Sequence, residues 1–181
     1  MRILVVLDKL FERASALCGV LASAAFVLML LNVFYDVIAR YVFNSVSIGM
    51  QELEWHLFSA VFLLGIPYAL RVDGHVRVDI FYDRWTDRGK AWINIFGALV
   101  FLLPFSALIY WYGTGFVHEA WVLNESSGDP GGLPYRFIVK ALIPTSAVFT
   151  AISGLGMITQ ALRVLLLGEK YAHVNHQEGL A

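Results

Sequence analysis

The sequence predicts an all-α membrane protein with four transmembrane helices, and three observations lead to that prediction. Of the 181 residues, 59% are hydrophobic and only 15% are charged. In soluble domains about 45–50% of the residues are apolar and about 25% are charged. The apolar residues gather in four long runs, and crossing about 30 Å of hydrocarbon takes roughly 20 residues of helix. Lys and Arg concentrate in alternate loops. Residues 1–170 therefore form a single four-helix membrane domain, and residues 171–181 form a polar C-terminal tail.

The first span is expected at about residues 14–39. Residues 2–13 carry apolar side chains at helical spacing, so they form either a short helix on the membrane surface or an extension of the span. Asp8 and Glu12 in this stretch, and the length of the apolar run that follows, argue against a cleaved signal peptide.

The second span is expected at about residues 51–71, with Pro67 near its end, where a neighbouring helix can satisfy the freed carbonyl group. Residues 76–90 place apolar side chains at i, i+3, i+4 and i+7, which is typical of an amphipathic helix at the membrane interface. The candidate residues that anchor this helix at the interface are Phe81, Arg84, Trp85 and Arg88, together with Trp92 at the start of the next span.

The third span is expected at about residues 92–112, with aromatic residues at both ends and a kink at Pro104 in its middle. Residues 113–136 are rich in Gly, Ser, Asn, Asp and Pro, so they form a polar loop. The fourth span is expected at about residues 144–167, because Pro144 suits the first turn of a helix.

The positive charges predict the orientation of the four spans. The N-terminal segment, the loop between spans two and three, and the tail hold most of the Lys and Arg residues, so these parts are expected in the cytoplasm. The topology is then N-in/C-in. The net charge of −1 argues against a nucleic-acid partner. Cys18 is the single cysteine, so no intrachain disulfide can form.

Three polar residues recur every four positions in the first span: Asn32, Asp36 and Arg40. They share one face of a helix, near its outer (non-cytoplasmic) end. An intramembrane carboxylate is a candidate functional site because its desolvation is unfavourable. However, Asp36 and Arg40 have the favourable i, i+4 order of an ion pair. A structural or subunit-contact role is therefore favoured over a proton or ion relay.

Glu52, Glu54 and His56 cluster where the second span enters from the outer side, and Glu52 and His56 share a face of the helix. His118 and Glu119 lie on the same membrane side, but nothing in the sequence fixes their distance from this pair. A metal site would need more convergent ligands, so a hydrogen-bond cluster that faces a partner is favoured. His56 and His118 are also the candidates for haem ligation, yet no span holds a mid-membrane histidine. We therefore expect no metal and no cofactor, and no catalytic motif is present.

Several segments, in their order and spacing, resemble the small membrane (Q-type) subunit of tripartite ATP-independent periplasmic (TRAP) transporters. They are residues 40–45 (RYVFNS), 51–53 (QEL), 64–65 (LG), 69–71 (ALR), 74–79 (GHVRVD) and 140–144 (KALIP), with Gln160 in the last span. The resemblance extends over nearly the whole chain.

The resemblance implies a non-enzymatic scaffold in the bacterial inner membrane, which binds a large multi-span permease subunit. The permease would take up organic acid anions, driven by a sodium gradient, and an extracytoplasmic solute-binding protein would deliver them. Asn32, Asp36, Arg40, Glu52 and His56 would be the partner contacts, and the interfacial helix would contact membrane lipid. The alternatives are a haem-bearing or plain four-helix anchor of a redox enzyme complex, and a small autonomous channel or carrier.

Overall fold

The structure, a computed structural model, describes residues 2–72, 74 and 85–168. Its helices are α1 (Arg2–Val42), α2 (Ile48–Arg71), α4 (Asp87–Gly97), the π-helix η1 (Ala98–Leu102), α5 (Leu103–Val122) and α6 (Phe137–Leu167). Since α4, η1 and α5 are continuous, the described residues make four long helices, each long and apolar enough to cross a membrane. The predicted class, an all-α membrane protein with four spans, is confirmed.

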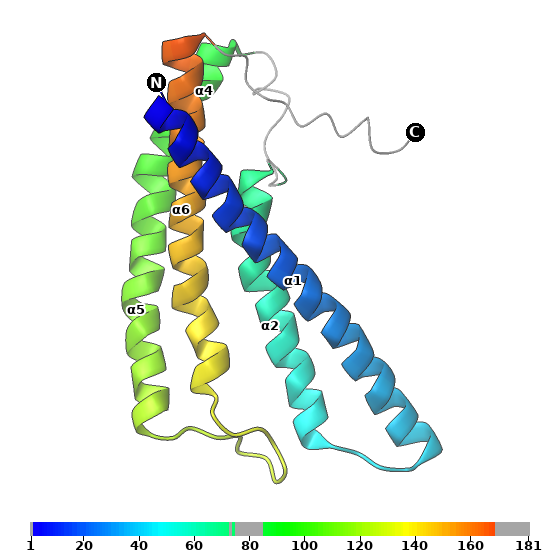
Figure 1. The fold of residues 1–181 in the computed structure, drawn as a ribbon. Helices are drawn as coiled ribbons and strands as arrows, with labels where there is room; N and C mark the ends of the chain where they lie inside the picture. The colour runs from blue at the N-terminus through cyan, green and yellow to red at the C-terminus, as the bar shows by residue number, and fades with distance from the viewer. Residues whose placement is uncertain (1, 73, 75–84, 169–181) are drawn as a thin grey trace, which may run out of the picture.

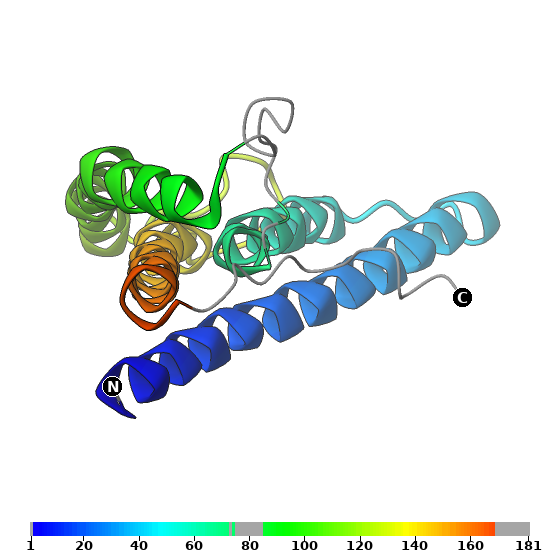
Figure 2. The ribbon, with the colours of Figure 1, turned by 90° about the horizontal axis from the view of Figure 1, so that it is seen from above.

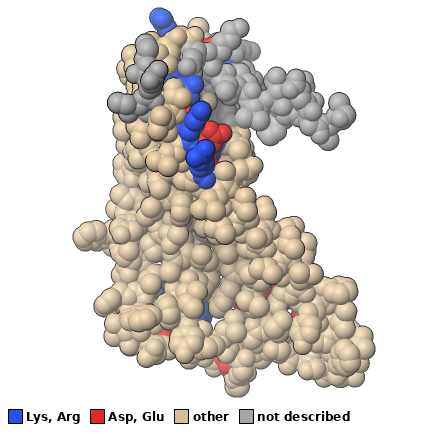
Figure 3. Space-filling view, in the orientation of Figure 1, with Lys and Arg blue, Asp and Glu red and all other residues tan. Residues whose placement is uncertain are grey.

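The bundle has two distinct ends (Figure 1). At the terminus end, α1 begins, α2 ends, α4 begins and α6 ends. At the loop end lie the two connections made of residues 43–47 and 123–136. Charged side chains gather toward the terminus end of the face in Figure 3, and small charged patches also lie toward the loop end of a mostly uncharged surface. The start of α1, the end of α2, the start of α4 and the end of α6 therefore lie on one side of the bundle, and the N-in/C-in orientation stays a prediction.

Helix α6 is the central helix, and it packs against α1, α2, α4, η1 and α5 (Figure 2). Its buried positions are mostly small, which lets the neighbouring helices approach closely in an apolar environment. These small buried residues are Ser146, Ala147, Thr150, Ser153, Gly154, Gly156, Thr159 and Ala161. An apolar contact of Ala161 and Val164 with Ala91 joins α6 to α4 near the terminus end.

Residues 2–13 extend the first span, so α1 is one helix of 41 residues. At a rise of 1.5 Å per residue it is about 60 Å long, roughly twice the thickness of the hydrocarbon core. It crosses α2 and α6 obliquely (Figures 1 and 2). Such a helix must tilt, extend past the hydrocarbon, or do both. Asn44, whose φ of 47° is left-handed, follows its last turn.

Helix α2 begins at Ile48, three residues earlier than expected, because Ser47 caps it by accepting a hydrogen bond from the Met50 N–H. Pro67 lies inside it and is buried. Proline has no N–H, so the carbonyl of Leu63 loses its helical donor. Ser146 of α6 donates to that carbonyl at 2.5 Å. A neighbouring helix therefore satisfies the freed carbonyl, as the sequence predicts.

The third span, residues 87–122, extends beyond the predicted 92–112 at both ends. The distortion expected at Pro104 takes the form of the π-turn η1 directly before it, in which the Leu103 N–H donates to the Ala98 carbonyl. A π-turn widens the helix by one residue per turn. It thus accommodates a proline that cannot donate to the preceding turn.

Most of the predicted interfacial helix, including the candidate anchors Phe81 and Arg84, lies outside the described residues. Its last residues, 87–90, belong instead to α4, because Thr86 caps that helix by accepting a hydrogen bond from the Gly89 N–H at 3.3 Å. The other candidate anchors, Trp85, Arg88 and Trp92, are exposed around the start of α4.

The expected start of the fourth span at Pro144 is wrong. Helix α6 starts at Phe137, and Pro144 is buried seven residues further on. A Cβ added to Gly113 of α5 would lie 3.3 Å from the Pro144 Cδ, so the proline packs closely against the neighbouring helix. Membrane helices tolerate an internal proline because neighbouring groups and local adjustments accommodate it. Proline was therefore a poor marker of the helix start.

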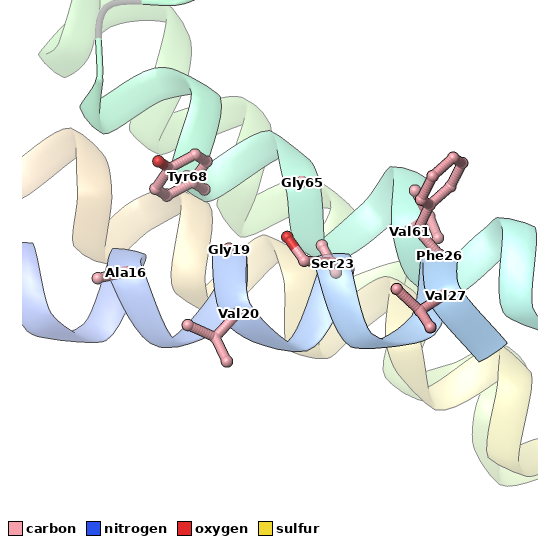
Figure 4. Close-up of a pocket in the computed structure, with 10 residues that line it drawn as sticks. Ala16, Gly19, Val20, Ser23, Phe26, Val27, Val61, Gly65 and Tyr68 are labelled. Atoms are coloured by element: carbon pink, nitrogen blue, oxygen red, sulfur yellow. The ribbon is translucent and has the colours of Figure 1, made fainter. Parts of the chain in front are cut away.

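Gly19 is expected to be required for the packing of α1 against α2. A Cβ at this position would lie 2.6 Å from the Cδ2 atom of Tyr68, whose ring lies across Gly19 in Figure 4. We expect Gly19→Ala to lower the free energy of unfolding by about 1–3 kcal/mol, measured by thermal unfolding in detergent. The control is Gly65→Ala on α2, where a Cβ meets nothing within 4 Å. Equal stability of the two variants would contradict this packing argument.

Candidate functional site: polar contacts at the two ends of the bundle

At the terminus end, the Asp8 carboxylate joins three helices. Its Oδ1 accepts a hydrogen bond from the Arg71 Nη2 of α2, and its Oδ2 accepts one from the Arg163 Nη1 of α6, both at 2.7 Å. The Thr159 hydroxyl lies 3.5 Å from Oδ1. The Asp8 side chain is only 8% exposed. A buried carboxylate is stable as an anion only when charged or polar groups surround it, and this one has two guanidinium groups.

This cluster is not among the sites predicted from the sequence, although α1 carries a signal for it. Asp8 lies on the same helical stripe as the other buried positions of α1, which recur with a seven-residue period. These positions are Asp8, Ser15, Ala22 and Asp36, with Cys18, Ala25 and Asn32 alongside them. Such a period marks the face of a helix that packs on its neighbours. A carboxylate on that face needs a cation from another helix.

Two serines continue the contact between α1, α2 and α6 further into the bundle. The Ser15 Oγ lies 2.7 Å from the Ser153 Oγ, and the Ser153 Oγ donates to the Pro67 carbonyl at 2.9 Å. Both serines are fully buried. Inside the membrane a hydroxyl group must bond within the protein, so this chain fixes the relative positions of the three helices.

At the loop end, Glu52 of α2 binds the connection between α5 and α6. Its Oε1 accepts a hydrogen bond from the Ser127 hydroxyl, and its Oε2 accepts one from the Leu133 N–H at 2.6 Å. The Leu133 carbonyl also accepts a hydrogen bond from the Ser127 N–H at 3.0 Å. One carboxylate therefore bonds to both sides of a narrow loop and attaches it to the start of α2.

An ion pair anchors the same loop to α6. Glu125 pairs with Lys140, and the Arg136 Nε lies 3.8 Å from the Glu125 Oε1. The Lys140 Nζ also lies 3.9 Å from the ring centre of Phe116 on α5, within the range of a cation–π contact. Residues 123–136 are thus held by α2, α5 and α6 together.

The three polar residues predicted to share a face of α1 do so. Asp36 is buried and pairs with Arg40 at 2.5 Å, so the predicted i, i+4 ion pair is confirmed. The Asn32 Nδ2 donates to the Met50 carbonyl at the start of α2, at 2.8 Å. Asn32 and Asp36 are buried against the rest of the chain, while the side chain of Arg40 is 43% exposed.

The predicted partner-contact residues therefore differ in what they can offer to another subunit. Asn32, Asp36 and Glu52 each have a partner within this chain. His56, one turn from Glu52, is partly buried. Arg40 combines a bond to Asp36 with the largest exposed fraction, so it is the strongest remaining candidate for a contact between subunits.

The candidate haem ligands occupy different helices, with His56 on α2 and His118 exposed on α5. His75, His173 and His176 lie outside the described residues. Within residues 2–72, 74 and 85–168, no group of three or more His, Cys, Asp and Glu side chains could hold a metal ion.

The sequence was compared with models of known protein families. The family model of the DctQ component of tripartite ATP-independent periplasmic transporters matches residues 29–164, which is most of the chain. Among curated proteins, no relative matches the chain. The matched range includes Asn32, Asp36, Arg40, Glu52 and His56, and it begins after Asp8. The predicted resemblance is confirmed: this multi-pass membrane protein belongs to the DctQ family, the small membrane component of TRAP transporters.

Proposed function

We propose that the chain is a static scaffold that braces the large permease subunit of a TRAP transporter in the bacterial inner membrane. In this proposal the permease takes up organic acid anions, driven by a sodium gradient, and an extracytoplasmic solute-binding protein delivers them. The family match supports the assignment to the transporter. The observation that supports bracing is the attachment of α1, α2 and α6 to one carboxylate, Asp8.

The position of the polar contacts favours a brace over a carrier. A carrier needs an accessible polar site near the bilayer midplane that changes its exposure during transport. Here, two small hydroxyls, those of Ser15 and Ser153, join α1, α2 and α6 further into the bundle and are bonded to neighbouring helices. The ion pairs of Asp8 and the hydrogen bonds of Glu52 lie toward opposite ends of the bundle. These contacts resist the relative sliding of helices.

The exposed apolar surface of the described helices suits lipid and a partner helix equally. Large apolar side chains are exposed along each long helix, including Phe34, Phe62, Phe101, Trp111 and Leu166. Lipid tails cover such a surface as well as protein does, so specific binding needs polar groups at its edge. Arg40, exposed near the loop end, is the polar group that we assign to the permease contact.

Arg40→Ala is expected to reduce the amount of permease that co-purifies with the tagged chain by at least about fivefold, because arginines often dominate interfaces. The single variant also leaves the buried Asp36 without its cation. The control is the double variant Asp36→Asn/Arg40→Gln, which removes both charges together. If Arg40 contacts the permease, both variants lose it. Full recovery of the permease with the double variant would assign Arg40 to the folding of this chain alone.

Transport measurements in reconstituted liposomes distinguish a scaffold role of this chain from a carrier role. Liposomes with the permease, this chain and the solute-binding protein are expected to accumulate an organic acid anion when a sodium gradient is applied. Liposomes with this chain alone are expected to show no flux above that of empty liposomes. Solute flux through this chain alone would contradict the scaffold role, as would full uptake by the permease without it.

A further inference from the structure

A groove runs along one side of the pair formed by α1 and α2. Its larger part has a volume of about 710 Å³ and is lined by residues that include Gly19 and Phe26 of α1 and Val61, Gly65 and Tyr68 of α2. Figure 4 shows these side chains along the two helices, with Tyr68 at one end and Phe26 and Val61 toward the other. The lining is mostly apolar, and its polar side chains are those of Ser23 and Tyr68.

A second hollow of about 310 Å³ lies further toward the loop end. It is lined by Met29 and Val33 of α1 and by Glu54, Trp55 and Phe58 of α2. The two hollows share one stripe on each helix, since the lining positions follow one another at intervals of three and four residues. The stripes are Gly19, Ala22, Phe26, Met29 and Val33 on α1, and Glu54, Phe58, Val61, Gly65 and Tyr68 on α2.

The combined groove has the length of a lipid chain. Residues 19–33 of α1 span about 21 Å at 1.5 Å per residue, and one leaflet of the hydrocarbon core is about 15 Å thick. Gly65 opens the groove at its middle, because a Cβ there would meet nothing within 4 Å. Its missing side chain is therefore not explained by packing within the described chain, in contrast to that of Gly19, which Tyr68 covers.

The loop end of the groove carries a negative charge next to an aromatic ring. Glu54 is partly buried, and within the described residues it has no ion pair or side-chain hydrogen bond. By contrast, Asp36 and Glu52, the other two carboxylates at this end of α1 and α2, are each bonded. Trp55 beside it is 74% exposed, and tryptophan favours the membrane interface, where its N–H can bond to lipid polar groups.

We propose that the groove binds one phospholipid with an ammonium headgroup, such as phosphatidylethanolamine. An acyl chain lies between the two stripes, and the ammonium group lies on the Glu54 carboxylate beside Trp55. Charge complementarity selects this headgroup, because a carboxylate near the low-dielectric interface attracts an ammonium group and repels a purely anionic head. The lipid would fill the space that Gly65 leaves between α1 and α2. Binding of the lipid does not depend on the scaffold role of the chain.

The test compares lipid retention by the purified chain after exchange into nanodiscs that contain phosphatidylethanolamine and phosphatidylglycerol in equal amounts. Native mass spectrometry after release in mild detergent is expected to find one retained phosphatidylethanolamine per chain. Glu54→Gln is expected to lower the preference of the chain for phosphatidylethanolamine over phosphatidylglycerol by about fivefold, because a partly exposed ion pair contributes an effect of about this size. Gly65→Leu fills the groove and is expected to lower retention of the lipid by about tenfold, since it displaces buried methylene groups.

The matched control is Gly97→Leu, which adds the same side chain at another helical glycine with open space around its Cβ. It is expected to retain the lipid as the wild type does, and thermal unfolding confirms that all variants are folded. Equal retention of both lipids by the wild type would overturn the proposal, as would unchanged retention by Gly65→Leu. If Gly65→Leu keeps the lipid but loses a co-purifying permease, the groove holds a partner helix and the lipid assignment is wrong.

Discussion

Asp8→Asn is expected to destabilise the bundle more than any other single change of charge at its terminus end. The amide keeps the shape of the carboxylate but leaves Arg71 and Arg163, both bonded to it at 2.7 Å, without their shared anion. Removing one partner of a buried ionic contact typically lowers the free energy of unfolding by about 3–5 kcal/mol. For a chain of this size, a loss of about 3 kcal/mol shifts the midpoint of thermal unfolding by about 6–12 °C.

The control for Asp8→Asn is Glu12→Gln, the same chemical change one turn further along α1. The Glu12 carboxylate lies 3.9 Å from Arg71, but its side chain is 63% exposed. An exposed pair contributes at most about 1 kcal/mol, so this variant should unfold within a few degrees of the wild type. Equal shifts for the two variants would mean that the cluster has no special role in joining α1, α2 and α6.

Glu52→Ala is expected to release the loop of residues 123–136 from α2 without unfolding the bundle. The change removes the acceptor of two hydrogen bonds, from the Ser127 hydroxyl and the Leu133 N–H. A hydrogen bond to a charged group contributes about 1.5–3 kcal/mol, so hydrogen exchange at the Leu133 amide should accelerate by about 10- to 100-fold. Peptide-level hydrogen–deuterium exchange across the loop measures this, because local opening determines the exchange rate.

The matched control for Glu52→Ala is Glu119→Ala, which removes an exposed carboxylate on α5 at the same end of the bundle. Exchange across residues 123–136 should match that of the wild type in this variant. If Glu52→Ala also leaves the exchange unchanged while it abolishes binding of the permease, then Glu52 acts as a partner contact and not as the anchor of the loop.

The number and type of the helices could be predicted because a long apolar run has few alternatives to a membrane helix. The ends of the helices were less predictable, since they depend on local capping groups. Ser47 starts α2 before Gln51, and α6 starts before Pro144 because an internal proline is tolerated where a neighbouring helix packs on it. The i, i+4 pair of Asp36 and Arg40 was predictable because both residues lie on one helix.

The contacts between distant residues could not be predicted in the same way. Asp8 is 63 and 155 residues from the two arginines that it binds. Glu52 is 75 and 81 residues from its two donors in the loop. A single sequence gives helical periodicity, which places Asp8 on a buried stripe, but it does not specify which residue of another helix faces that stripe. These pairings depend on the tilt of α1 and on the path of the loop.

The most direct test of the scaffold role is purification of the tagged chain from its native membrane in mild detergent, with mass spectrometry of the proteins that accompany it. We expect a large multi-span permease in near-equal amount, and we expect the Arg40→Ala variant to recover much less of it. Recovery of the wild-type chain by itself, or together with a redox enzyme and a haem absorbance band, would contradict the assignment as a transporter scaffold.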